Sequence, residues 1–192
     1  MFLHIPKTAG QFIRYFLRSF KKTWVTSGSH VTYDQEIKDG TKPYILVRNP
    51  WDWYVSRWSY YQKYNNRQFF NNMTFVQHLN SLVNFDVGLI HKEARENHKE
   101  FLWKCKTLND WHLYMSCGQT VQIFKMEDII ETVKSVSKLE NIDIDDKEIE
   151  KFCKQRINCV SHPNYRTYYD EESKELVRQY DKEIVEKFNY SF

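Results

Sequence analysis

Phe2-Leu-His-Ile-Pro-Lys-Thr-Ala-Gly-Gln11 opens the chain with a short apolar run, a turn and the start of a helical pattern. The run at 2–5 is closed by Pro6 and is typical of a buried strand. After the turn, apolar residues recur at helical spacing, at Phe12, Ile13, Phe16, Leu17 and Phe20.

The turn itself has the features of an anion site. A tight turn between strand and helix directs backbone N–H groups at one point, where the helix dipole favours an anion. With the charge of Lys7, and with Gly10 allowing close approach, the turn predicts a phosphate site. The alternative is an ordinary turn with a solvated lysine.

A second strand–turn–helix pattern lies at Tyr44-Ile-Leu-Val-Arg-Asn-Pro-Trp-Asp-Trp-Tyr-Val-Ser56. It predicts a strand at 44–47 and a helix at 51–64, with Pro50 suited to the first helical turn. Arg48 follows the strand, where open α/β sheets bind ligands. Ser56 stands eight residues later and could reach the same anion. The alternative pairs Arg48 with Asp52 in a structural salt bridge.

The remaining periodicities complete an alternation of strands and helices. Strands are expected at 24–26 and 121–124, and helices at 126–139, 146–156 and 172–189. This order predicts an α/β fold, with a parallel sheet flanked by helices in a single domain over residues 1–192. The segment 64–110 is polar and is expected to form an acceptor-side or lid segment.

The composition of the chain argues against nucleic-acid, membrane and metal partners. The 192 residues carry 28 basic and 25 acidic side chains, and this net charge of +3 is too small to indicate a nucleic-acid partner. No apolar stretch is long enough to cross a membrane and no signal peptide is seen, so the chain is expected to be cytoplasmic, without a membrane partner. The four cysteines show no zinc-type spacing, and no metal is expected.

The first turn differs from the phosphate loop of P-loop NTPases. Their pattern, GxxxxGK[ST], places the lysine after the glycine, whereas Lys7 precedes Gly10 and the loop is shorter. A small P-loop-type nucleotide kinase is therefore kept only as an alternative function.

The two motifs together resemble those of sulfotransferases that use 3′-phosphoadenylyl sulfate (PAPS) and release adenosine 3′,5′-bisphosphate (PAP), particularly the Golgi carbohydrate type. The resemblance rests on the pair His-Ile-Pro-Lys-Thr-Ala-Gly and Val-Arg-Asn-Pro-Trp-Asp, followed by Ser-x-x-Ser-Tyr-Tyr. It implies a P-loop-like sulfotransferase fold. It also implies that the 5′-phosphosulfate is held by Lys7, Thr8, Ala9, Gly10 and Gln11, and that the 3′-phosphate is held by Arg48 and Ser56.

At two positions the sequence differs from the residues usual in the family, and at a third the resemblance suggests a further contact with the donor. Gln11 stands where the family usually has Thr or Ser, and Trp53 stands where an Arg is common. Both suggest weaker or altered donor contacts rather than loss of binding. Arg166 falls where the family has a late loop over the nucleotide and could touch the donor.

Sulfuryl transfer needs a base for the acceptor hydroxyl. Gly28-Ser-His-Val-Thr-Tyr33 resembles a segment of the uronyl 2-O-sulfotransferases, which implies His30 as catalytic base, with Asp34 and Glu36 as substitutes. Lys7 is expected to neutralise the leaving phosphate, so that no metal is required. His4 is expected to be buried rather than catalytic. The motif type suggests a saccharide acceptor; a tyrosyl peptide, a lipid or a small alcohol stays open, as does a catalytically weak homologue that binds PAP or a polyanion.

Overall fold

The computed structural model describes residues 1–21, 43–64, 73–83, 106–155 and 162–192. Its contacts divide the chain into two compact units. The first unit comprises Met1–Arg48 and Met115–Cys159, and the second comprises Asn49–Tyr114 and Val160–Phe192. The division into one domain over residues 1–192 stays a prediction.

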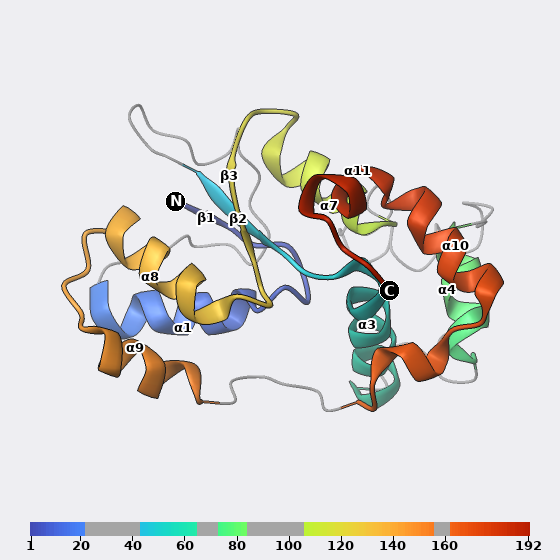
Figure 1. The fold of residues 1–192 in the computed structure, drawn as a ribbon, viewed down its shortest axis with the longest axis horizontal. Helices are drawn as coiled ribbons and strands as arrows, with labels where there is room; N and C mark the ends of the chain where they lie inside the picture. Colours follow the sequence, from blue (N-terminus) through green and yellow to red (C-terminus); the bar gives the residue numbers. More distant parts are fainter. Residues whose placement is uncertain (22–42, 65–72, 84–105, 156–161) are drawn as a thin grey trace, which may run out of the picture. The chain divides into compact units, whose positions relative to one another are not determined.

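The first unit is built on a parallel sheet (Figure 1). Strands β1 (Phe2–Leu3), β2 (Tyr44–Val47) and β3 (Gln122–Lys125) lie in that order, and both strand pairs are parallel. The parallel sheet flanked by helices is therefore confirmed. The strand expected at 24–26 lies outside the described residues.

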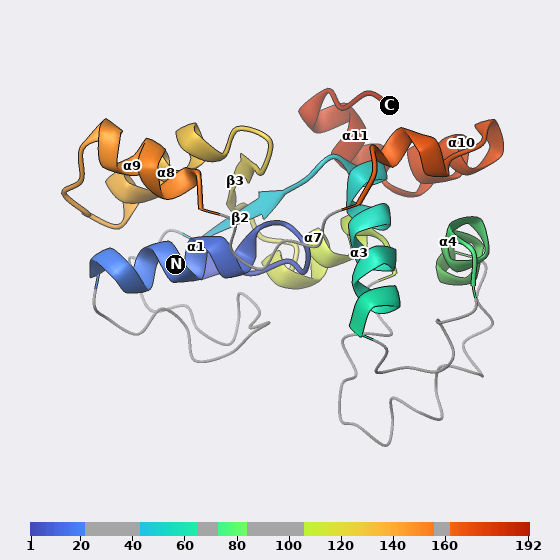
Figure 2. The ribbon, with the colours of Figure 1, turned by 90° about the horizontal axis from the view of Figure 1, so that it is seen from below.

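Three helices share one apolar core with the sheet. They are α1 (Gly10–Lys21), α8 (Ile129–Leu139) and α9 (Asp146–Cys153), and Figure 2 shows α8 and α9 beside α1. Phe152 of α9 has its ring centroid 5.2 Å from that of Phe16 and 5.3 Å from that of Phe12. Phe2 and Tyr44 reach the same core from the sheet. The helical spacing seen in the sequence is thus the face that α1 buries.

Two predicted helix boundaries in this unit are corrected. The helix expected from residue 126 begins at Ile129, because the Met126 N–H donates to the Val47 carbonyl (2.8 Å) and continues the strand ladder. The helix expected to reach residue 156 ends at Cys153.

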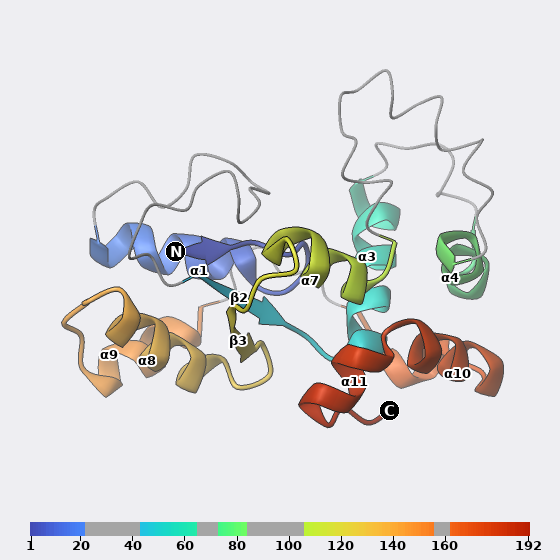
Figure 3. The ribbon, with the colours of Figure 1, turned by 90° about the horizontal axis from the view of Figure 1, so that it is seen from above.

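The second unit consists of helices in its described residues (Figure 3). Its elements are α3 (Pro50–Tyr64), α4 (Phe75–Val83), α7 (Leu108–Ser116, whose last two residues belong to the first unit), the 3-10 helix η1 (Tyr165–Tyr168), α10 (Glu171–Tyr180) and α11 (Lys182–Phe188). Helices α3, α4 and α10 pack against one another. The polar segment predicted at 64–110 therefore contains α4 and the start of α7.

The single helix predicted over 172–189 is wrong, because the structure has two helices that meet at Asp181. Asp181 leaves helical geometry at φ −106° and ψ 26°. Its buried carboxylate accepts a hydrogen bond from the Asn109 N–H (2.7 Å). This contact with α7 redirects the chain, and sequence periodicity carries no trace of it.

Within the described ranges, none of the helices is both long and apolar enough to span a membrane.

Candidate functional site

The turn between β1 and α1 has an unusual backbone. Lys7 (φ 65°) and Ala9 (φ 59°) both adopt the left-handed conformation, although neither is a glycine. Such residues persist only where their surroundings hold them, and they are common at ligand sites. Turns that include left-handed residues form concave groups of N–H donors that suit anions. The predicted phosphate turn therefore has a backbone suited to that role.

Thr8, between these two residues, stabilises the turn from within. Its hydroxyl donates to the Ile5 carbonyl (2.8 Å), and the residue is fully buried. The hydroxyl is thus committed to the protein, which leaves the Thr8 backbone N–H as the group through which it could meet a ligand.

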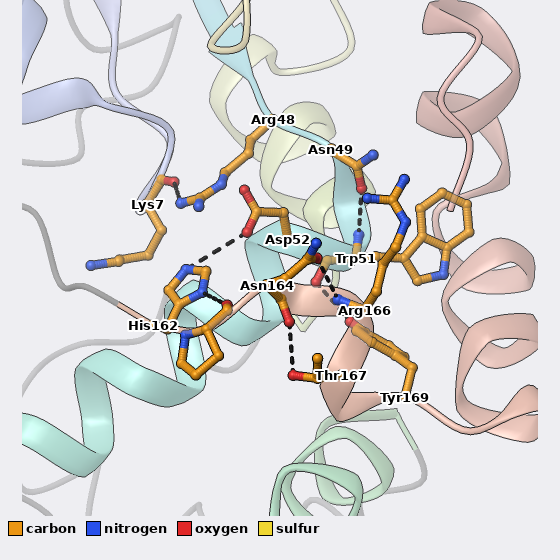
Figure 4. A network of polar contacts seen from close by, with 11 residues as sticks. Lys7, Arg48, Asn49, Trp51, Asp52, His162, Asn164, Arg166, Thr167 and Tyr169 are labelled. Atoms are coloured by element: carbon orange, nitrogen blue, oxygen red, sulfur yellow. Dashed lines mark hydrogen bonds and ion pairs between the residues drawn. The ribbon is translucent and has the colours of Figure 1, made fainter.

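Arg48 connects the two sequence motifs. It follows β2, and its Nη1 donates to the Lys7 carbonyl (3.3 Å), as Figure 4 shows. The structure therefore brings Lys7 and Arg48 together, as parallel neighbouring strands require.

Gly10 begins α1 next to the side chain of His4. A Cβ placed on Gly10 would lie 1.6 Å from the His4 Cδ2 atom and 1.9 Å from Nε2. His4 itself is buried, with 8% of its surface exposed, as the sequence predicted. The absence of a side chain at Gly10 thus makes room for an imidazole ring, and the close approach to an anion expected at this residue stays a prediction.

The first turn of α1 carries no acidic residue, and Gln11 is exposed. The helix ladder begins with the Ile13 N–H donating to the Ala9 carbonyl (3.1 Å). The earlier N–H groups of the helix have no carbonyl one turn back within it, which suits an anion.

In the second unit, the predicted donor residues occupy different environments. Ser56 is buried on α3, with 4% of its surface exposed. Arg166 is exposed on η1, and its guanidinium carbon lies 4.8 Å from the Tyr165 ring centroid and 5.7 Å from that of Phe192. The contacts of both residues with a donor stay predictions.

The start of α3 carries a second polar cluster that the sequence did not indicate (Figure 4). Asn49 Oδ1 accepts from the Trp51 N–H (3.1 Å), and Asp52 Oδ1 lies 3.6 Å from His162 Nε2. The other ring nitrogen of His162 lies 2.8 Å from the Pro163 carbonyl.

His30, Asp34 and Glu36, the candidates for a base, lie outside the described residues.

Four other histidines are described, and the side chains of three of them are packed or paired within the protein. His4 packs on Gly10, His162 faces Asp52, and His78 is fully buried. Burial, with Arg57 nearby, lowers the pKa of His78 to about 3. Burial also lowers the pKa of His112, the fourth.

Among the described residues, no three His, Cys, Asp or Glu side chains gather as metal ligands would. The expectation that the chain needs no metal stays a prediction.

Comparisons with known proteins bear on the fold. No protein-family model and no curated protein matches the sequence. Among solved structures, the chain is similar to mouse sulfotransferase SULT7A1 complexed with PAP, with a TM-score of 0.56 and 16% sequence identity. The similarity covers 100% of this chain and 84% of the mouse chain. The chain therefore has a sulfotransferase fold, as the two motifs predicted.

The contact between His4 and Gly10 was missed at the sequence level, although a signal existed. Phe2 and His4 stand two positions apart in the strand expected at 2–5, and residues at this spacing point to one face. Since Phe2 faces α1 in the core, His4 had to face the beginning of the same helix.

Proposed function

We propose that this protein is a sulfotransferase that moves the sulfuryl group of PAPS to an acceptor hydroxyl. The observation that carries the proposal is the turn after β1, where Lys7 and Ala9 are left-handed and the Lys7 carbonyl accepts from Arg48. The similarity in fold to a sulfotransferase complexed with PAP supports the same assignment.

The donor contacts follow from the chemistry of the turn. Lys7 and the backbone N–H groups of residues 8–11 would hold the 5′-phosphosulfate, together with the N-terminal end of α1. Arg48, which follows β2 and contacts this turn, would meet the 3′-phosphate in a charge-assisted contact. Ser56 and Arg166 are proposed as further donor contacts on the evidence of the sequence motifs.

In the proposed reaction, the acceptor oxygen attacks the sulfur in line with the leaving group. A new O–S bond forms while the bond from sulfur to the 5′-phosphate oxygen breaks, so PAP leaves with the electron pair. His30 would take the proton of the acceptor hydroxyl. Lys7 would stabilise the negative charge that grows on the leaving phosphate oxygen.

A saccharide is proposed as the acceptor, because the motif pair resembles that of the carbohydrate-type enzymes. Trp58, an aromatic ring of the kind that stacks on sugars, is engaged within the second unit. Its Nε1–H donates to the Met73 carbonyl (3.3 Å), and its ring packs on Tyr168 with centroids 5.5 Å apart. The acceptor surface is therefore expected to be formed by other residues.

The proposal is tested by measuring thermal stabilisation by PAP and by ATP with magnesium, and then transfer of radiolabelled sulfate from PAPS to a panel of saccharides. PAP is expected to bind with micromolar affinity or better, a free energy of roughly −8 kcal/mol. It should raise the Tm more than ATP does. PAP binding without transfer to any acceptor would favour the non-catalytic alternative. Equal stabilisation by ATP and PAP would favour a kinase.

A further inference from the structure

We propose that His4 is a positioning residue for the turn that would hold the 5′-phosphosulfate, because its ring fills the place of the side chain that Gly10 lacks. The ligand-binding part of this inference rests on the proposed function. The packing part stands on the contact itself.

The evidence is the fit between one ring and one missing side chain. A Cβ on Gly10 would come within 1.9 Å of two His4 ring atoms, whereas real Cβ contacts essentially never fall below 3.0 Å. The Cα–Cβ bond of a helical residue tilts toward the N-terminus of the helix, which is where the His4 ring lies. The ring also stacks on Phe2, with centroids 5.9 Å apart, so it has little room to withdraw.

His4 and Gly10 are the two ends of the turn. Between them lie the left-handed residues Lys7 and Ala9, each held in a conformation that costs about 1 kcal/mol or more. The Thr8 hydroxyl secures the turn from inside, and Arg48 secures it from β2. The packing of His4 on Gly10 fixes how closely α1 approaches the strand, and so fixes the span that these residues must cover.

The packing is tested with Gly10→Ala, His4→Ala and the double variant His4→Ala/Gly10→Ala, by measuring Tm for each. Gly10→Ala is expected to lower the Tm by several degrees, because the new methyl group collides with the ring. The double variant should be more stable than the sum of the single effects predicts, because removal of the ring makes room for the methyl group. Additive effects in the double variant would overturn the inference.

The positioning role is tested with two ligands, PAP and adenosine 3′-monophosphate, which lacks the 5′-phosphate. His4→Ala should weaken PAP binding by about tenfold and change the binding of the monophosphate less than about twofold, since only PAP uses the turn. Ile149→Ala is the matched control, because Ile149 is buried in the same core on α9. It should lower the Tm and leave the ratio of the two affinities unchanged.

If His4→Ala and Ile149→Ala change the two affinities alike, His4 only packs the core and the positioning role is wrong. If the unaltered protein binds neither nucleotide, the proposed function fails. The Tm measurements on Gly10 and His4 would still decide the packing part.

Discussion

The turn after β1 and the junction between α10 and α11 place their polar groups in opposite ways. In the turn, Thr8 and Arg48 hold the main chain, while the Lys7 side chain is half-buried and Gln11 is exposed. At the junction, Asp181 has no exposed surface, and its carboxylate accepts from the Asn109 N–H inside the protein.

This difference indicates how each region should respond to substitution. Groups directed at a ligand should change binding and turnover with little effect on stability. A charged group directed at the protein interior should change stability and its dependence on pH.

The largest expected effect is on turnover, through the proposed base. His30→Ala should reduce turnover by about 10²–10⁴-fold, the usual contribution of a positioned base, because only the acceptor proton depends on it. PAP affinity should stay nearly unchanged, since His30 would not touch the donor. The measurement is steady-state transfer from PAPS together with calorimetric binding of PAP. Near-normal turnover would move the search to Asp34 or Glu36.

Lys7→Ala should reduce both donor affinity and turnover. Removal of one group that stabilises charge in the transition state typically lowers kcat by about 10²–10³-fold. PAP binding should also weaken, because Lys7 would contact the phosphate before the reaction. The Tm should change little. Lys138→Ala, at an exposed position of α8 in the same unit, is the control and should leave binding and turnover unchanged. A large Tm loss in Lys7→Ala would mean that the turn is a structural element after all.

Asp181→Asn tests whether the buried carboxylate at the junction of α10 and α11 controls stability and its dependence on pH. Burial raises the pKa of Asp181 to about 7, from an ordinary value of 3.8. The folded state therefore holds the proton more tightly than the unfolded state does. The protonated Asp181 carboxyl therefore contributes to the stability of the folded state below pH 4, and this contribution is lost as the pH rises through about 7. The loss is about 4 kcal/mol, because each pKa unit corresponds to about 1.4 kcal/mol.

Neutral asparagine removes this pH dependence, so Asp181→Asn should gain stability relative to the parent protein between pH 5 and pH 8. Urea unfolding is followed by tryptophan fluorescence, because Trp51, Trp53, Trp58 and Trp111 all belong to the second unit. Asp110→Asn is the control on α7, where the carboxylate accepts from the Lys106 and Thr107 N–H groups. It should be destabilised at both pH values. Parallel pH profiles for Asp181→Asn and the parent protein would contradict the prediction.

Much of the first unit could be predicted from its sequence because local patterns determine it. The apolar spacing from Phe12 to Phe20 anticipated α1, and the run at 44–47 anticipated β2. In the second unit, Pro50 marked the start of α3 as a residue without an N–H, which the first helical turn tolerates. The motif pair anticipated the sulfotransferase fold.

The details that decide the candidate site depend on contacts between residues distant in the chain. No glycine marks the left-handed positions at Lys7 and Ala9, since they are enforced by the surrounding protein. The bond from Arg48 to the Lys7 carbonyl joins residues 41 positions apart. The break at Asp181 depends on Asn109, 72 positions away. Periodicity within one element cannot report any of these.

Arg48→Ala should weaken the binding of PAP strongly and the binding of a ligand without the 3′-phosphate slightly, whereas the motif alone predicts an effect on PAP only. Loss of a charge-assisted contact with the 3′-phosphate is worth about 1.5–3 kcal/mol, which is more than tenfold in PAP affinity. The variant also loses the bond to the Lys7 carbonyl, so adenosine 5′-monophosphate should bind a few-fold more weakly as well. Calorimetry with both ligands measures the difference. Equal losses would mean that Arg48 acts only by holding the first turn.

The smallest expected effect comes from Thr8→Val, which preserves side-chain volume and removes the hydroxyl. The resemblance to sulfotransferases implied that Thr8 contacts the donor, and the buried bond to Ile5 leaves that contact to its backbone N–H. The variant should lose about 1 kcal/mol of stability, the usual worth of one hydrogen bond, because the Ile5 carbonyl loses its partner. PAP affinity should fall only about two- to threefold, through a looser turn rather than a lost contact. Thr8→Ser retains the hydroxyl and should bind PAP like the parent protein. A loss of more than tenfold in Thr8→Val at unchanged Tm would show that the hydroxyl turns to meet the ligand, and the turn would then rearrange when the donor binds.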